Sequence, residues 1–238
     1  MKKISITLLV MTLNEIDGVK KILPQIKKNW FDKILIVDGG STDGTLEWIK
    51  KNNYEYYVQK QKGFRHAYEE IWPKITSDYV ITFSPDGNSL VEKLPNLIKE
   101  LNKNQYDMVI VSRYLREAKS YDDDLITRFG NKLFTFTTNL IYRGKLTDTM
   151  VIYRGYKTNL PSRINVMNDI SFNFYEKLFK TKISWEPLLS LRVLKHKLNY
   201  HEIPGDEPER IGGERKLQII RWGLAYYSQI LFDILNSR

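Results

Sequence analysis

The sequence contains no cysteine, which excludes disulfide bonds and cysteine-ligated metal sites and favours a reducing compartment. Its three histidines, His66, His196 and His201, are too scattered to predict a histidine metal site. No run of about 18 apolar residues occurs, so no membrane-spanning helix is expected. The apolar start of the chain, Ile4 to Leu13, contains hydroxyl residues and is not followed by a small-residue cleavage site. A first β-strand is therefore expected there rather than a signal peptide.

Acidic residues are fewer than basic ones, 28 against 37, and the net charge is +9. A basic surface favours polyanionic partners such as nucleotides, lipid phosphates or anionic membranes, although it also serves solubility alone. The basic residues do not gather with aromatic residues into a stacking platform, so no nucleic-acid partner is predicted. Hydrophobic residues make up 42% of the chain, which is enough for a packed core.

The first half of the chain alternates short apolar runs with segments of helical spacing. Strands are expected at residues 4–10, 33–37, 54–58, 79–83 and 108–111, and helices at 18–28, 45–51, 64–75 and 91–102. This rhythm predicts an α/β fold with a mostly parallel, Rossmann-like sheet flanked by helices. Ligands of such sheets bind beyond the carboxyl ends of the strands, so functional residues are expected after each apolar run.

The second half is less regular. It predicts helices at 122–143, 170–179 and 188–197, a strand at 146–153, a polar loop at 203–215 and an amphipathic helix at 216–235. We therefore expect one domain over residues 1–215, with a nucleotide-binding half (1–115) and an acceptor-side half (116–215). Residues 216–238 are expected to form a C-terminal amphipathic helix.

Two strand-end segments carry the residues with the clearest chemistry. In VDGGSTDGT, Asp38 ends a buried strand and its carboxylate can accept hydrogen bonds from a base or ribose, while Gly39 and Gly40 allow close backbone approach. In PDGN, Asp86 and Asn88 place two oxygen side chains where they can flank a divalent cation. The alternatives are an ordinary strand-to-helix turn for the first segment and a type I turn for the second.

Five segments together resemble the family 2 glycosyltransferases, which have the GT-A fold, and within them the dolichyl-phosphate mannose synthase-like branch. These are VMTLNE from Val10, VDGGSTDGT from Val37, KGFRHA from Lys62, DGN from Asp86 and SRY from Ser112. The likeness covers residues 4–155 and continues more loosely through WEPLL (185–189) and the segment 201–216. It implies a glycosyltransferase that uses a nucleoside-diphosphate sugar and has a helical C-terminal extension.

The resemblance also implies roles for residues on the donor side. Glu15 and Asp38 are expected to hold the nucleoside, and Lys62 and Arg65 to lie near the base or the diphosphate. Asp86, together with Asn88, is expected to hold Mg²⁺ or Mn²⁺ bridging the diphosphate, where the cation stabilises the leaving group.

Further basic residues and two carboxylates complete the expected site. Arg113, Arg210 and Lys216 match positions near phosphate groups. Asp148 and Glu186 match acceptor-side positions, where a hydroxyl acceptor needs a general base and a phosphate acceptor does not. Structural or surface roles are the alternative for each carboxylate, and for Asp169 the structural role is favoured.

The sequence departs from the family pattern at three places. Asn88 replaces the second aspartate of the D-x-D motif, so the protein supplies one formal charge fewer to the cation. Residues 150–156 (MVIYRGY) replace a Ser-Gly-containing stretch on the acceptor side, and Arg215 replaces a serine before Lys216. The acceptor is therefore left open between a polyprenyl phosphate and a glycan or other hydroxyl group.

The sequence thus predicts a metal-assisted, inverting hexosyltransferase that uses a UDP-, GDP- or CDP-sugar in the synthesis of cell-envelope glycans. Two alternatives are a catalytically silent protein that binds a sugar nucleotide or a lipid, and a sugar nucleotidyltransferase. The second normally has a glycine-rich loop after its first strand, where this chain has Thr12-Leu13-Asn14-Glu15. We expect a cytoplasmic protein that contacts the inner face of the membrane peripherally and forms a homo-oligomer.

Overall fold

The computed structural model describes residues 4–212 and 219–235. A seven-stranded sheet with the order β3-β2-β1-β4-β6-β5-β7 forms its centre. The strands are β1 (Ile6–Thr12), β2 (Lys33–Asp38), β3 (Glu55–Val58), β4 (Tyr79–Phe83), β5 (Met108–Ser112), β6 (Arg154–Lys157) and β7 (Tyr200–Pro204). All neighbouring pairs are parallel except the two that involve β6. The predicted α/β fold with a mostly parallel sheet is confirmed.

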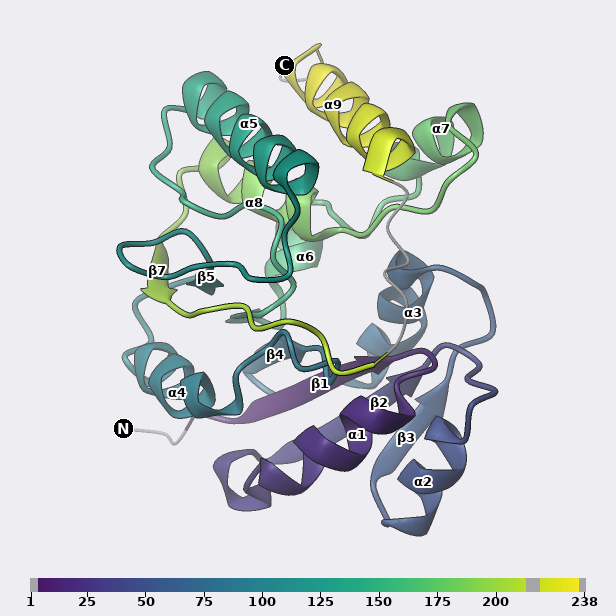
Figure 1. The fold of residues 1–238 in the computed structure, drawn as a ribbon. Helices are drawn as coiled ribbons and strands as arrows, with labels where there is room; N and C mark the ends of the chain where they lie inside the picture. Colours follow the sequence, from purple (N-terminus) through teal and green to yellow (C-terminus); the bar gives the residue numbers. More distant parts are fainter. Residues whose placement is uncertain (1–3, 213–218, 236–238) are drawn as a thin grey trace.

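Helices of the first half lie around the part of the sheet formed by the N-terminal strands (Figure 1). They are α1 (Ile16–Ile22), α2 (Thr45–Lys51), α3 (Phe64–Ile71) and α4 (Leu94–Asn102). Two of them end earlier than predicted, because a proline follows each: Pro24 and Pro73 lie in the short 3₁₀ helices that follow α1 and α3. Strands β1 and β4 are buried along their whole length, as expected for strands covered on both faces.

The second half adds a helical layer at one end of the molecule (Figure 1). It contains α5 (Leu125–Tyr142), α6 (Leu160–Arg163), α7 (Ile170–Leu178), α8 (Glu186–Lys195) and α9 (Ile219–Leu235). Helix α9 packs against α5, α7 and α8. The side chain of Asp124 accepts the N–H of Thr127 and begins α5, while Arg143, in the left-handed conformation, ends it.

The strand predicted at residues 146–153 is wrong. Backbone N–H groups of this segment donate to carboxylates instead of to a neighbouring strand: those of Thr147 and Asp148 to Glu202, and those of Met150 and Val151 to Asp148. The strand that follows, β6, begins only at Arg154.

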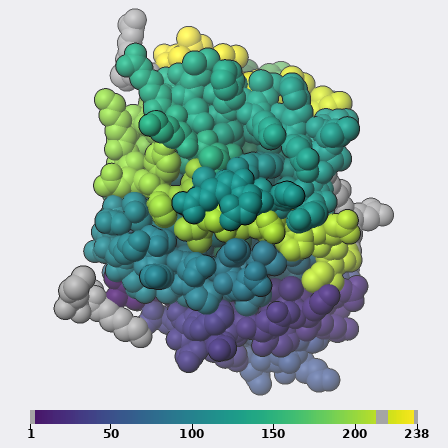
Figure 2. Space-filling view, turned by 60° about the vertical axis from the view of Figure 1, so that its left-hand side comes forward, coloured from purple at the N-terminus to yellow at the C-terminus, as the bar shows by residue number. Residues whose placement is uncertain are grey.

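The edge strand β7 was missed: its polar sequence YHEIP shows no strand pattern, and its last two residues were included in the loop predicted at 203–215. It pairs in parallel with β5, and its terminal proline is tolerated because it lies at a sheet edge. After β7, residues 205–212 cross the molecule between the helical layer and the nucleotide-binding half. Figure 2 shows this segment in yellow-green between the teal and the blue-purple parts.

Candidate active site

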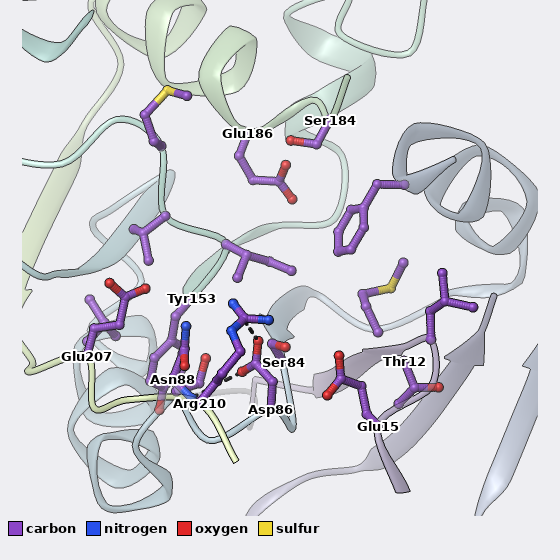
Figure 3. A pocket seen from close by; sticks show the side chains of 18 of the residues that line it. Thr12, Glu15, Ser84, Asp86, Asn88, Tyr153, Ser184, Glu186, Glu207 and Arg210 are labelled. Carbon is purple, nitrogen blue, oxygen red and sulfur yellow. Dashed lines mark hydrogen bonds and ion pairs between the residues drawn. The ribbon is translucent and has the colours of Figure 1, made fainter. Parts of the chain in front are cut away.

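A cavity of about 360 Å³ opens at the carboxyl ends of β1, β2, β4 and β5. Residues that follow these strands form one wall, and residues 150–153, the start of α8, the segment 205–210 and Trp222 of α9 form the other. Several side chains from the predicted site line this cavity, and most of them are labelled in Figure 3: Glu15, Asp86, Asn88, Arg113, Glu186 and Arg210.

The turn after β4 brings Asp86 and Asn88 together at the cavity floor. The backbone N–H of Asn88 donates to Asp86 Oδ1 at 3.1 Å. Gly87 between them has φ of +94°, a left-handed conformation that glycine adopts without strain. The backbone N–H of Ile211 donates to the carbonyl of Asp86 at 2.6 Å, so the segment 205–212 is fastened directly onto this turn.

Arg210 provides the positive charge beside this turn. Its Nη2 lies 3.8 Å from Asp86 Oδ2 and 3.3 Å from Asp122 Oδ2. Burial raises the pKa of Asp86 above its ordinary value, although the charge of Arg210 acts in the opposite direction. Arg210 Nε is buried and has no hydrogen-bond partner among the described residues, so the guanidinium retains a donor for an anion.

The oxygen atoms of this turn fit a divalent cation. Asn88 Oδ1 is buried and accepts no hydrogen bond within the described part of the chain, and it stands next to a buried carboxylate. Carboxylate and amide oxygens are the ligands that Mg²⁺ and Mn²⁺ prefer, and Mg²⁺ commonly takes only one or two from the protein. In residues 4–212 and 219–235, no cluster of three or more His, Asp or Glu side chains forms a complete protein cage. The remaining ligands would have to come from substrate and water.

Arg113 and Asp148 form a buried, bidentate ion pair at the cavity wall. Arg113 Nε and Nη2 donate to the two oxygens of Asp148 at 2.7 and 2.9 Å, and Nη1 lies 3.3 Å from Glu207. Burial would raise the pKa of Asp148, but Arg113 outweighs it and holds that pKa below its ordinary value. Both oxygens of Asp148 are thus engaged with a cation and backbone N–H groups. Asp148 itself does not line the cavity, and its contacts hold Arg113 in place at the cavity wall.

Glu186, the first residue of α8, is buried and lines the opposite side of the cavity. The hydroxyl of Tyr68 donates to its carboxylate. Beneath it, the fully buried Arg154 donates to the carbonyls of Glu186 and Val151 and to the hydroxyl of Ser190. Arg154 therefore ties the start of α8 to the loop 149–152, and this fixes the position of the Glu186 carboxylate relative to the cavity.

On the donor side, Glu15 lines the cavity and Asp38 does not. Glu15 points inward (Figure 3), and its backbone N–H donates to Thr45 Oγ1 at 3.0 Å. The fully buried carboxylate of Asp38 accepts the N–H groups of Gly40 and Ser41 and the hydroxyls of Thr12 and Ser41. It orders the turn after β2, whose Val37 and Gly39 face the cavity instead.

Two other predicted residues, Arg65 and Lys62, do not line the cavity in the described structure. Arg65 is buried away from it, where its guanidinium pairs with Glu69, Asp169 and Glu176. Its ion pairs hold α3 against α7, which differs from the expected place near the base or diphosphate. Lys62 is exposed and absent from the cavity wall. Lys216 lies outside the described residues.

Sequence reasoning missed two carboxylates of the site. Asp122 accepts the side-chain amide of Asn88 at 3.0 Å, and Glu207 contacts Arg113 at the cavity wall. Burial raises the pKa of Glu207, although Arg113 acts against this. Both lie in polar loops without periodicity. The sequence features that could have pointed to them are the run of three aspartates from Asp122 and the acidic residues within the segment 205–210.

The closest functional information comes from comparison with known proteins. The family described as glycosyl transferase family 2 matches residues 7–162. Glycosyltransferase AglJ of Haloferax volcanii is 25% identical over 153 residues, which are 64% of this chain and half of that protein's length. A UDP-N-acetylglucosamine–dolichyl-phosphate N-acetylglucosaminyltransferase of Methanococcus voltae is 23% identical over 225 residues, 84% of each chain.

Solved structures support the same fold. Glucosyl-3-phosphoglycerate synthase from Mycobacterium tuberculosis, in complex with Mn²⁺, UDP and phosphoglyceric acid, superimposes with a TM-score of 0.68. The likeness covers 98% of this chain and 78% of that one at 14% identity. The same synthase was also solved with Mg²⁺ and UDP. The strand-end cavity, the GT-A fold and a family match over more than half of the residues agree: the chain belongs to the family 2 glycosyltransferases and is a glycosyltransferase.

Proposed function

We propose that this glycosyltransferase moves a sugar, with inversion, from a nucleoside-diphosphate sugar to a polyprenyl phosphate, as in the dolichyl-phosphate mannose synthase-like branch. One observation carries the proposal. Asp86, Asn88 and Arg210 line the same cavity, and Asn88 Oδ1 has no hydrogen-bond partner among the described residues, so a cation and a guanidinium can share the diphosphate charge. Mg²⁺ or Mn²⁺ bound there would stabilise the departing nucleoside diphosphate electrostatically.

The chain's own residues supply the rest of the leaving-group environment. Arg210 keeps an unpartnered Nε at the cavity and is fastened to the Asp86 turn through its neighbour Ile211. Arg113 adds positive charge from the wall, although Asp148 and Glu207 balance much of it. Of the two arginines, Arg210 is therefore the better donor to phosphate oxygens, because its Nε has no partner while Nε, Nη1 and Nη2 of Arg113 are all engaged.

A lipid-phosphate acceptor is supported by the Methanococcus voltae relative, which is named for dolichyl phosphate and aligns over 84% of both chains. Met150, Val151 and Ile152 make the acceptor side of the cavity apolar. A hydroxyl acceptor is the second candidate, because Glu186 presents a carboxylate there that can take a proton. A peripheral position at the inner face of a membrane is part of the proposal. In the described ranges, no helix has the length and apolarity needed to cross a bilayer.

A donor screen tests the proposal against its two alternatives. We expect one of the UDP-, GDP- or CDP-sugars, added with Mn²⁺, to stabilise the folded chain by about 2.7 kcal/mol at 100 times its Kd. The same donor should then lose its sugar to an added short-chain polyprenyl phosphate. Stabilisation without turnover of any donor would favour the catalytically silent binder. Formation of a sugar nucleotide from a nucleoside triphosphate would favour the nucleotidyltransferase.

The variant Glu186→Gln separates the two acceptor classes. A phosphate acceptor is already ionised, so the kcat measured with such an acceptor should change little when the carboxylate is lost. A hydroxyl acceptor depends on proton removal, and its kcat should fall by roughly 10²- to 10⁴-fold. Glu176→Gln is not a suitable control, because Glu176 pairs with buried Arg65; Glu47→Gln, on the remote helix α2, removes a charge without touching the cavity.

A further inference from the structure

Three helices of the helical layer each carry apolar residues that are exposed to solvent. On α5, one stripe is 40–83% exposed and consists of Leu125, Ile126, Phe129, Leu133, Phe136 and Leu140. On α7 the exposed apolar residues are Ile170, Phe174 and Leu178, and on α9 they are Ile220, Leu224, Leu231 and Leu235. Their spacing of three, four or seven residues places each set on one side of its helix.

The three helices that carry these stripes are neighbours. Helix α9 packs against both α5 and α7, with ring contacts between Phe134 and Tyr227 and between Tyr175 and Phe232. Figure 1 shows α5, α9 and α7 side by side at the end of the molecule opposite α2. A patch built from three neighbouring helices exceeds the scattered apolar residues of an ordinary surface and marks an interaction site.

The charges of the three helices identify the partner. Within α5, α7 and α9 as described, the two acidic residues, Glu176 and Asp233, are buried in ion pairs with Arg65, Lys182, Arg192 and Lys195. The exposed charged residues on these helices are basic: Lys132, Lys177 and Arg221. Apolar stripes edged by basic residues suit an anionic bilayer surface. A second copy of the chain would bring the same basic edge and repel it.

We propose that this face, the exposed apolar residues of α5, α7 and α9, lies on an anionic membrane with its helices in the interfacial plane. Trp222, on the same α9, lines the active-site cavity, so a polyprenyl acceptor held in the membrane would reach the cavity along α9. The surface itself does not depend on the proposed sugar transfer, because vesicle binding needs neither donor nor cation.

Vesicle co-sedimentation of the full chain tests this face. We expect binding to vesicles of phosphatidylglycerol mixed with phosphatidylcholine, and weaker binding to phosphatidylcholine alone. Phe129→Ser combined with Phe136→Ser should weaken binding at least tenfold. Neutralising Lys132, Lys177 and Arg221 to Gln should weaken binding to anionic vesicles by roughly fivefold per charge. The matched control, Tyr56→Ser with Val58→Ser, removes exposed apolar groups from β3 and should change nothing.

Two outcomes would overturn the proposal. One is no binding to anionic vesicles at low salt by the folded wild type. The other is a dimer in sedimentation equilibrium that Phe129→Ser with Phe136→Ser dissociates, while vesicle binding is unaffected by this change. Thermal unfolding of each variant shows whether the fold is retained. Neither outcome would alter donor stabilisation, so a failure here removes the membrane position from the proposed function but leaves the proposed sugar transfer standing.

Asp122, in the loop before α5, contacts both Asn88 and Arg210. Asn88 Nδ2 donates to Asp122 Oδ2 at 3.0 Å. A carboxylate only accepts hydrogen bonds, so it fixes the amide with its nitrogen toward Asp122 and its oxygen away. That oxygen is the buried atom without a partner beside Asp86. The Arg210 guanidinium lies between the two carboxylates, 3.8 Å from Asp86 and 3.3 Å from Asp122, so both act on one positive charge.

We infer that Asp122 is a positioning residue for the proposed cation site. Asp122 orients the side-chain amide of Asn88 so that Oδ1 can serve as a neutral ligand. It also supplies a negative charge behind Asn88, in place of the charge that an aspartate at position 88 would carry. Outer carboxylates of this kind typically affect metal affinity 10- to 100-fold. The inference rests on the proposed function, because it presupposes a cation at Asp86 and Asn88.

A charge exchange tests this inference with Mn²⁺ affinity as the readout. Mn²⁺ is titrated by electron paramagnetic resonance in the presence of the nucleoside diphosphate selected by the donor screen. Asp122→Asn should weaken Mn²⁺ binding at least tenfold. Combining it with Asn88→Asp should restore the affinity to near the wild-type value, because the carboxylate then stands in the inner position. The control Asp123→Asn removes the neighbouring charge, which contacts Tyr114, and should leave the affinity unchanged.

The possible results distinguish a failure of the cation site from a failure of the Asp122 role alone. If the wild type binds no Mn²⁺, the proposed cation site itself fails. If the wild type binds Mn²⁺ but Asp122→Asn binds it equally well, only the role of Asp122 is overturned. Loss of affinity that Asn88→Asp does not restore, in a protein with unchanged thermal unfolding, would also contradict the positioning role.

Discussion

At the residue scale, Asp86 is the side chain on which the proposed chemistry depends most. Replacing it with Asn keeps its shape and its place in the turn but removes the charge that would hold a cation. We expect Asp86→Asn to fold normally and to lose at least about 10²-fold in kcat, as with other lost electrostatic stabilisers. The comparison is Asp206→Asn, which removes another cavity-lining carboxylate and should keep turnover near the wild-type rate. Equal turnover in both variants would argue against a cation at Asp86.

A second residue, Glu202, should make stability depend on pH. Burial raises its pKa from 4.5 to about 7, although the N–H groups of Thr147 and Asp148 oppose this. The folded state therefore binds the proton more tightly than the unfolded state does, and this contribution favours folding at low pH. It is lost as pH rises from about 4.5 through 7, which amounts to about 3 kcal/mol at most. Urea unfolding from pH 4.5 to 8 should show a flatter profile for Glu202→Gln than for the wild type.

The motif positions show how far single residues could be predicted. Glu15, Asp86, Asn88, Arg113, Glu186 and Arg210 all reach the cavity wall. Asp38 and Arg65 belong to the same motifs, but their polar atoms bind other parts of the protein: Asp38 accepts internal hydrogen bonds, and Arg65 forms internal ion pairs. A motif indicates that a residue type is needed at a position, not whether its polar atoms face a ligand or its own fold. Contacts such as Asn88 to Asp122 join separate loops, and local sequence carries no sign of them.

At the element scale, regular elements were predictable where apolar periodicity was strong. The strands β1, β2, β4 and β5 and the helices α2, α5 and α7 lie close to their predicted positions. The strand predicted at residues 146–153 is absent, because backbone N–H groups there bind the Glu202 and Asp148 carboxylates. The strand β7 was missed because it is a polar edge strand. In both places, tertiary hydrogen bonds rather than side-chain pattern decided the conformation.

Helix α1 packs very closely against the turn that holds the proposed cation site. A Cβ added to Gly18 would meet the backbone carbonyl oxygen of Pro85 at 2.3 Å and Asp86 Cα at 3.3 Å. Gly18→Ala should therefore displace either α1 or the Asp86 turn, lowering stability by about 1–3 kcal/mol and weakening Mn²⁺ affinity. Gly130→Ala in α5 meets nothing within 4 Å and should stabilise by up to about 1 kcal/mol. Similar unfolding temperatures for both variants would contradict this packing.

At the scale of the whole molecule, the arrangement of layers could not be read from the sequence. The amphipathic pattern of α9 was recognised, but one face packs on α5, α7 and α8 while the other remains exposed. Its inner side contributes polar anchors as well as apolar ones: Tyr226 accepts the N–H of Ser184, and Gln229 donates to the carbonyl of Ser171. The predicted boundary at residue 216 therefore does not mark off a separate appendage: the helix that follows it, α9, helps to hold the helical layer together.

The ion pairs of Asp233 allow the contribution of α9 to the stability of the fold to be measured. Its carboxylate lies 2.9 Å from Arg192 Nε and 2.9 Å from Lys195 Nζ, and Arg192 is buried in α8. Asp233→Ala leaves these cations without their carboxylate partner, which typically costs about 3–5 kcal/mol. For a chain of this size the unfolding temperature should fall by about 10 °C. Leu231→Ser changes an exposed residue of the same helix and should leave the unfolding temperature unchanged. If Asp233→Ala unfolds at the wild-type temperature in a calorimetric scan, α9 is an appendage rather than part of the folded core.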